Sequence, residues 1–404
     1  MSHDDTPGHA QNPTPGDTSS RFNSWSLIEG LSRFGSTNST VSHRSFFQGE
    51  HVTRRMDGIR EAIIFIRANW KAGYPRFMYE LQESFLSSAP DFSNNTILSK
   101  LTKEWADRKQ NSETSADAIN DYTFLKLYTS EAGYRQIFSV LNNAFRIDAL
   151  EDEALRLRAA VFLVELLTIE LFNYTFTPSI DMNVRWDRSG GFTGTAYRGL
   201  CLSAEHLQDF LDLMTKPIKE RYWSIPLAFV SCTTSQELAQ LFAKENAEDE
   251  TKRRVLFRTH IVSLDEESLK IYAKHFPTSV VTSICAVDIS ALSMYPEERE
   301  IVLRGPFFQL VNARQETTND GNELYILDTL VFNTNRDHPS TMELSAEEGE
   351  KARSLFSCLI EIARARECMK LAKECGIPQD VDAYKSLHGD AQKRLARLLL
   401  EFEQ

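Results

Sequence analysis

The hydrophobic and polar positions divide the chain into four stretches. Residues 1–50 hold few large aliphatic side chains and many polar residues, Pro and Gly, so we expect a disordered tail that cannot offset its ordering entropy. Residues 51–187 place apolar side chains at helical spacing, which predicts a helical subdomain, strongest at 151–172. Residues 188–334 alternate short apolar runs with turns, which predicts a β-rich α+β domain. Residues 335–404 return to helical spacing.

The β-rich stretch begins where Asp187, Arg188, Ser189, Gly190 and Gly191 interrupt the helical pattern. We expect helices at 203–214, with Ser203 as N-cap, and at 235–247. We expect strands at the following positions: 194–199, 227–233, 254–261, 279–287, 300–303, 307–312 and 324–332. The turn residues at 318–322 predict a hairpin between the last two strands.

The C-terminal stretch predicts a helical hairpin. One helix follows Ser345 and runs to Glu374, where Gly376, Ile377 and Pro378 end it. A second helix continues to the C-terminus, and the apolar positions of both helices suggest that they pack on the core. The expected fold class is therefore α+β, with helical N-terminal and C-terminal arms around a β-rich core.

Charge and composition narrow the partners. The chain of 404 residues is 42% hydrophobic and has a formal net charge of -12. A protein that binds nucleic acid through phosphates is normally basic, at least locally, and no stripe of Lys and Arg is present, so we expect no nucleic-acid partner. Residues 1–20 lack an apolar signal region, and the most apolar run, 159–172, contains Glu165 and Glu170. We therefore expect no membrane partner and a cytoplasmic location.

The cysteines indicate a reducing compartment and no metal. The six cysteines form no CxxC pair and have no zinc-ligand spacing with histidine. We interpret them as reduced, mostly buried thiols.

Three segments of the β-rich domain place chemically useful residues where a strand ends. They are Tyr197-Arg198-Gly199, Ser231-Cys232-Thr233 and Glu298-Arg299-Glu300. A guanidinium can bind two phosphate oxygens at once, and the glycine beside it allows a ligand to approach the backbone. The hydroxyl groups can hold a carboxylate in one rotamer or bind a ribose.

The paired carboxylates Glu298 and Glu300 precede the apolar run Ile301, Val302 and Leu303. Two residues apart on a strand, both side chains would point to the same face. The simple interpretation is a solvated, charged entry to a strand. In the other interpretation, a carboxylate near a ribose stabilises positive charge at the anomeric carbon, which points to cleavage of a nucleotide's glycosidic bond.

The order and spacing of the three segments resemble the R-S-E class of mono-ADP-ribosyltransferases, specifically the eukaryotic arginine-specific kind. The resemblance covers residues 120–335 and is most specific at 295–303. It includes the segment Ala239-Gln240-Leu241-Phe242-Ala243 after the second motif. It implies an ADP-ribosyltransferase-like core of two packed sheets, with NAD as substrate and no metal.

By this resemblance, each site residue receives a role. Arg198 would hold the NAD phosphates and ribose, and the backbone of Gly199 would bind the nicotinamide amide. Ser231 would orient Glu300, and Thr233 would contribute to NAD binding. Glu300 would bind the nicotinamide ribose and stabilise the oxocarbenium-like state as nicotinamide leaves.

The resemblance also implies the acceptor. Glu298 would take a proton from a target guanidinium, and Tyr295 would help to recognise the protein substrate. A guanidinium is not a nucleophile at neutral pH until a base meets it, since its pKa exceeds about 12. The expected partner is a protein with an accessible arginine.

Two positions depart from the family pattern. The middle residue of the Ser-Thr-Ser-like motif is Cys232, so Thr233-Thr234-Ser235 is an alternative alignment, although the spacing to Ala239 favours Ser231. Residues 303–306, Leu-Arg-Gly-Pro, replace a turn that is often Pro-Pro-Gly-like in the family.

Four hypotheses remain open from sequence. The leading one is an NAD-dependent arginine mono-ADP-ribosyltransferase. The others are an NAD glycohydrolase at the same site, a non-catalytic scaffold of the same fold, and an α+β domain with coincidental motifs.

Overall fold

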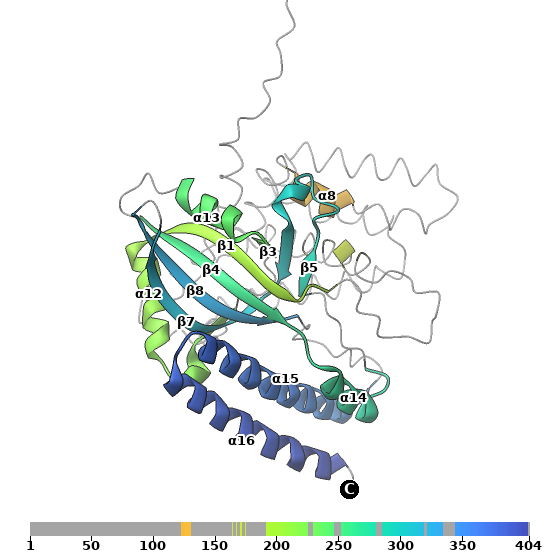
Figure 1. Ribbon diagram of the computed structural model, residues 1–404. Helices are drawn as coiled ribbons and strands as arrows, with labels where there is room; N and C mark the ends of the chain where they lie inside the picture. The colour runs from red at the N-terminus through yellow and green to blue at the C-terminus, as the bar shows by residue number, and fades with distance from the viewer. Residues whose placement is uncertain are drawn as a thin grey trace, which may run out of the picture.

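The computed structural model describes part of the chain (Figure 1). The described residues are 123–130, 164, 167, 170, 171, 174, 191–224, 229–245, 252–279, 285–318, 321–333 and 344–402. The predicted tail at 1–50 and most of the predicted helical subdomain at 51–187 lie outside these residues.

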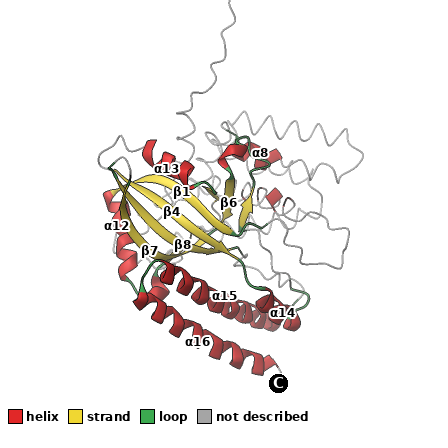
Figure 2. Ribbon diagram, in the orientation of Figure 1, coloured by secondary structure: helices red, strands yellow, loops and turns green. Residues whose placement is uncertain are grey.

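An eight-stranded sheet forms the centre of the fold (Figure 2). Its strand order is β2-β7-β8-β4-β1-β3-β6-β5. The strands are β1 (Gly194–Ser203), β2 (Tyr222–Ser224), β3 (Phe229–Thr233), β4 (Lys252–Val262), β5 (Ala286–Asp288), β6 (Glu300–Arg304), β7 (Phe307–Thr317) and β8 (Glu323–Phe332). The pairing of β4 with β8 is parallel, and the other strand pairs are antiparallel.

The sheet consists of two parts that meet at one residue pair. β1 pairs with β3 at Tyr197 and Thr233 alone, whereas β1 pairs with β4 along its whole length. One hydrophobic core contains residues from both parts, including Leu200 and Phe257 from one part and Ile301 from the other. The expected α+β fold is confirmed, and its strands form one eight-stranded sheet whose two parts share a hydrophobic core.

Helix α12 (Ala204–Thr215) covers the shared core. Ser203 caps it by accepting a hydrogen bond from the backbone N–H of His206 at 3.2 Å, as the sequence predicts. Its buried residues Leu207 and Phe210 join the core cluster, and Phe210 makes an edge contact with Trp223 of β2. The short helix η6 (Ile218–Glu220) connects α12 to β2.

The opposite face of the sheet carries helices α13 and α15. Alternate residues of a strand face opposite sides, so Leu256 of β4 packs with Ala239 of α13 (Gln236–Glu245), while Phe257 faces the shared core. Further along this face, Leu330 of β8 packs with Leu371 of α15 (Ala346–Glu374). Figure 1 shows α15 along the sheet and α16 (Pro378–Phe402) outside it.

The C-terminal hairpin confirms the predicted boundaries. Ser345 and Glu348 form a capping box at the start of α15. The helix ends before Gly376, whose φ of 71° is costly for other residues, and α16 begins at Pro378. The buried side of α15 also packs against α14 (Glu266–His275), where Tyr272 contacts Phe356.

Several elements differ from the sequence-based expectation, and one of them, the strand β2 (Tyr222–Ser224), was not predicted. Helix α14 was not predicted, although Asp265 caps it by accepting from the N–H of Ser268 at 2.8 Å and two glutamates follow. The predicted strand at 279–287 is described only as β5, because residues 280–284 lie outside the described part. The predicted hairpin between β7 and β8 is confirmed, with Thr317 opposite Glu323.

One helix of the N-terminal arm lies against the sheet. Helix α8 (Thr123–Thr129) places Tyr128 next to Phe229 of β3, with ring centroids 5.7 Å apart. The buried carboxylate of Glu170 accepts hydrogen bonds from the backbone N–H groups of Phe124 and Leu125 at 3.3 and 2.7 Å. The described residues contain no helix with the length and apolar character needed to cross a membrane.

Candidate active site

The three segments singled out in the sequence lie on three neighbouring strands. Tyr197 on β1 pairs with Thr233 on β3, and Thr233 pairs with Glu300 on β6. Arg198 and Ser231 are close to this row of pairs, on β1 and β3. The fold therefore brings together residues that are separated by about a hundred positions in sequence.

Arg198 connects the two parts of the sheet where they separate. Its side chain is only 3% exposed, and its Nη1 donates a 2.6 Å hydrogen bond to the backbone carbonyl of Ser231. A charged donor makes such a bond stronger than one between neutral groups. The guanidinium is thus fixed between β1 and β3, next to Ser231.

The carboxylate of Glu300 is oriented by two serine hydroxyls. Ser231 Oγ donates to Glu300 Oε1 at 2.5 Å, and Ser293 Oγ donates to Oε2 at 3.3 Å. Glu300 is 2% exposed. A buried charge requires such hydrogen bonds, because burial removes its hydration. The structure thus places Ser231 in contact with Glu300, while its role in orienting Glu300 for catalysis remains a prediction.

Ser231 rather than Ser235 is the serine that meets Glu300. Ser235 lies before α13, where its Oγ accepts from the backbone N–H of Leu238 at 3.2 Å and contacts the carboxylate of Glu237 at 3.0 Å. Of the two alignments open from sequence, the one based on Ser231 therefore matches the geometry.

Glu298 is buried, but it is not on the strand. It ends the short helix η7 (Pro296–Glu298), and Arg299 then adopts a left-handed conformation with φ 49°. The prediction that Glu298 and Glu300 point to the same face of a strand was therefore wrong, because Glu298 lies outside the strand. Glu298 is nevertheless 3% exposed, which contradicts the simple interpretation of a solvated strand entry.

Thr233 fixes the position of the Glu298 turn. Its Oγ1 donates to the backbone carbonyl of Glu298 at 2.6 Å and accepts from the N–H of Ser235 at 3.0 Å. The residue is fully buried. These contacts give Thr233 a structural role next to the site, while its predicted part in NAD binding remains a prediction.

Gly199 is required by the packing of α13. A Cβ at this position would lie 1.6 Å from the backbone carbonyl oxygen of Ala239. The sequence reasoning expected the glycine to make room for a ligand, whereas the structure gives helix packing as the reason. Binding of nicotinamide by its backbone remains a prediction.

Cys232 faces the shared core between the strands. It is 1% exposed, and burial raises the pKa of its thiol to about 12, although nearby Arg198 acts in the opposite direction. The thiol is therefore neutral at physiological pH, and it occupies the middle position of the motif as a small apolar group.

Sequence reasoning missed Ser293, which joins Glu300 to the loop that carries Tyr295. Ser293 is 8% exposed, and its Oγ also accepts from the backbone N–H of Tyr295 at 3.2 Å. Tyr295 itself is partly exposed, and the neighbouring Met294 is 64% exposed. The signal in the sequence was a serine two residues before Tyr295, but nothing in its type indicated contact with Glu300, which follows Ser293 by seven residues.

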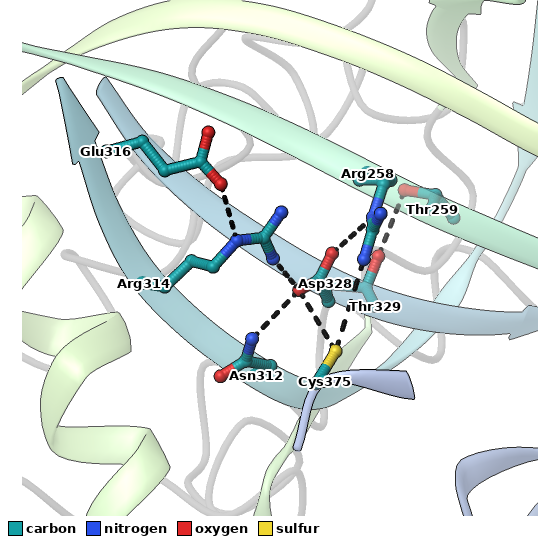
Figure 3. Close-up of polar contacts among 8 residues, drawn as sticks. All are labelled: Arg258, Thr259, Asn312, Arg314, Glu316, Asp328, Thr329 and Cys375. Atoms are coloured by element: carbon teal, nitrogen blue, oxygen red, sulfur yellow. Dashed lines mark hydrogen bonds and ion pairs between the residues drawn. The ribbon is translucent and has the colours of Figure 1, made fainter. Parts of the chain in front are cut away.

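Another buried carboxylate lies on the face of the sheet on which α13 and α15 pack, and Figure 3 shows its polar contacts. Asp328 of β8 is fully buried. Its Oδ1 accepts from Arg258 Nε at 2.5 Å, and its Oδ2 accepts from Arg314 and from Asn312 Nδ2 at 3.0 Å. We call these residues, together with Cys375, the Asp328 cluster.

Cys375 brings the end of α15 to this cluster. Its Sγ lies 3.5 Å from Asp328 Oδ2, and burial together with this carboxylate raises the pKa of the thiol to about 11. Nearby, burial and then Arg258 lower the pKa of His260. The Asp328 cluster thus ties β4, β7 and β8 to the turn between the C-terminal helices.

In the part of the chain that the structure describes, no group of three or more His, Cys, Asp or Glu side chains could hold a metal ion. The turn at 303–306, which departs from the family pattern, ends β6 with Gly305 at φ 52° and leads directly into β7.

The similarity of the chain to known proteins is low. No protein-family model matches the chain, and no curated protein was found to be similar to it. Among solved structures, it is similar to the ADP-ribosyltransferase HopU1 of Pseudomonas syringae pv. Tomato DC3000, with 18% identity, a TM-score of 0.29, and coverage of 52% of this chain and 75% of that one. It is also similar to Plx2a, an ADP-ribosyltransferase toxin from Paenibacillus larvae, with 15% identity, a TM-score of 0.29, and coverage of 57% and 92%. Because of these low scores, the proposal below rests on the site's own geometry.

Proposed function

We propose that this protein is an NAD-dependent mono-ADP-ribosyltransferase that transfers ADP-ribose to an arginine of a protein. The observation that supports it most directly is the carboxylate of Glu300, held by Ser231 at 2.5 Å beside the buried guanidinium of Arg198. The resemblance of the three segments to the R-S-E class gives these residues their roles.

In this reaction, Arg198 binds the phosphates of NAD, because a guanidinium is suited to oxyanions. Its fixed contact with the Ser231 carbonyl pre-orients it. The residues present therefore fit an anionic nucleotide on the Arg198 side of the site.

Glu300 then stabilises the transition state. The bond between C1′ of the ribose and the nicotinamide nitrogen breaks, and its electron pair leaves with nicotinamide. Positive charge develops on the ribose, and a nearby carboxylate that is already oriented stabilises it without further reorganisation. The hydrogen bonds from Ser231 and Ser293 supply that orientation.

Glu298 takes the proton that the target arginine releases. A guanidinium nitrogen of the target arginine bonds to C1′, and its proton goes to the carboxylate of Glu298. The turn that carries Glu298 is fixed to β3 through Thr233. The net charge of -12 and the partly exposed Tyr295 favour a basic protein segment as acceptor.

The test is incubation of the purified full chain with labelled NAD and agmatine, a small guanidine acceptor. We expect transfer to agmatine that disappears in Glu300→Ala. In Glu298→Gln we expect transfer to be lost while NAD cleavage continues, because the acceptor base is removed and the groups around the ribose remain. Glu297→Gln is the matched control, since Glu297 is an exposed acid in the same turn.

Each other outcome points to a different hypothesis. Free ADP-ribose without an agmatine adduct in the wild-type protein would indicate an NAD glycohydrolase. Loss of both reactions in Glu298→Gln would contradict its role as acceptor base. If the protein neither binds nor cleaves NAD, the remaining hypotheses are a non-catalytic scaffold and an α+β domain with coincidental motifs.

A further inference from the structure

Ser293 is in contact with both sides of the site proposed above. Its hydroxyl donates a hydrogen bond to Glu300 Oε2 and accepts one from the backbone N–H of Tyr295. Glu300 is the group assigned to NAD cleavage, whereas Tyr295 and Glu298 belong to the segment assigned to the acceptor. A single hydroxyl therefore joins the two functions.

The loop between β5 and β6 is otherwise fixed through its backbone. The N–H of Ile289 donates to the carbonyl of Glu300 at 3.0 Å, and the N–H of Ser293 donates to the carbonyl of Ile289 at 2.9 Å. These bonds bring the Ser293 side chain back over Glu300. Beyond Ser293 the loop becomes exposed at Met294, so Ser293 is the point where the buried and exposed parts of the loop meet.

The two oxygens of Glu300 are thereby held from opposite sides. Ser231 belongs to β3, next to Arg198. Ser293 belongs to the loop between β5 and β6 that carries Tyr295, which we call the acceptor loop. The bond from Ser293 adds an anchor at the second oxygen, from a different segment of the chain. The bond from Ser293 fixes the plane of the carboxylate relative to Tyr295.

We infer that Ser293 is a positioning residue that couples the acceptor loop to Glu300 and so sets the ratio of arginine transfer to NAD hydrolysis. This inference rests on the proposed function. It assigns Ser293 no contact with substrate: the residue acts through Glu300 and through the Tyr295 backbone.

The experiment compares Ser293→Ala with the conservative Ser293→Thr and with Ser290→Ala in the full chain. Ser290 is a control from the same loop, since its Oγ bonds the exposed Asp288 at 2.6 Å and not Glu300. The measurements are kcat and KM for NAD hydrolysis, kcat for transfer to agmatine, and hydrogen exchange of the Tyr295 amide.

In Ser293→Ala we expect kcat for hydrolysis to fall about tenfold, as for loss of one hydrogen bond to a charged group, with KM for NAD little changed. Transfer should fall several-fold further, and exchange at Tyr295 should accelerate because its N–H loses its acceptor. Ser293→Thr should restore most of the transfer ratio, and Ser290→Ala should behave as the wild type.

The two possible failures are distinguishable. A wild-type protein that neither cleaves NAD nor transfers ADP-ribose would overturn the proposed function and this inference with it. Normal wild-type turnover with an unchanged transfer-to-hydrolysis ratio in Ser293→Ala would overturn the inference alone. An effect confined to KM, or an equal effect of Ser290→Ala, would also overturn it.

Discussion

Glu300 and Asp328 are both buried carboxylates on the same sheet, but they are held in different ways. Asp328 binds two guanidinium groups, from Arg258 and Arg314. Glu300 accepts hydrogen bonds from Ser231 and Ser293. Guanidinium groups bind both oxygens of Asp328 in ion pairs, whereas serine hydroxyls bind both oxygens of Glu300. We therefore expect Asp328 to fix structure and Glu300 to serve the proposed reaction.

The largest expected effect comes from Glu300→Gln. Neutralising this side chain should lower NAD cleavage about a thousandfold, because the developing ribose cation loses its counter-charge. The free energy of unfolding should change little or increase, since a buried charge is removed. Labelled-NAD turnover and urea denaturation measure the two quantities. A large loss of stability would place Glu300 with Asp328 as a structural acid.

Asp328→Asn should lower the stability of the protein and leave NAD cleavage nearly unchanged. The change leaves two guanidinium groups without their shared counter-charge, and we expect a loss of about 3 kcal/mol in the free energy of unfolding. The Asp328 cluster also holds Cys375, so hydrogen exchange should accelerate at the turn between α15 and α16.

At a temperature where Asp328→Asn is still folded, kcat for NAD cleavage should stay within a few-fold of the wild type. Urea denaturation and NAD turnover on the same sample provide the comparison with Glu300→Gln. Wild-type stability together with a strong catalytic defect would reverse the distinction between the two acids.

The smallest effect concerns His260, next to the Asp328 cluster. Its pKa is lowered in the folded protein by burial and by Arg258, so the unfolded chain binds a proton at higher pH than the folded one. His260 therefore contributes stability above its unfolded pKa of about 6.5, and this contribution is lost as the pH falls below that value. The free energy of unfolding, measured between about pH 7.5 and 5.5, should fall less in His260→Gln than in the wild type. Parallel profiles would show that His260 does not contribute.

Much of the fold could be predicted from sequence, because local signals and tertiary packing agree there. The capped helices after Ser203 and Ser345 and the hairpin between β7 and β8 follow their turn and cap residues. Helix α14 was missed because its apolar stripe is short, although Asp265 supplies an N-cap.

The sequence identified most residues of the candidate site, but it did not reveal how the loops place them. Arg198, Ser231 and Glu300 come together as the motif spacing suggested. The placement of Glu298 was wrong, because the left-handed conformation of Arg299 ends the strand periodicity and depends on tertiary contacts. Ser293 was missed for a similar reason: its contact with Glu300 is made by the turn of the loop, which residue type alone does not reveal.

The single pair of residues that joins β1 to β3 has a mechanical consequence. Within each part of the sheet, several successive backbone pairs resist bending, whereas the backbone pairing between β1 and β3 is at Tyr197 and Thr233 alone. The backbones of the two parts are therefore joined along one short edge. A small rotation about that edge would leave the backbone ladders of both parts intact, and the bond from Arg198 to the Ser231 carbonyl is a side-chain contact that would oppose it.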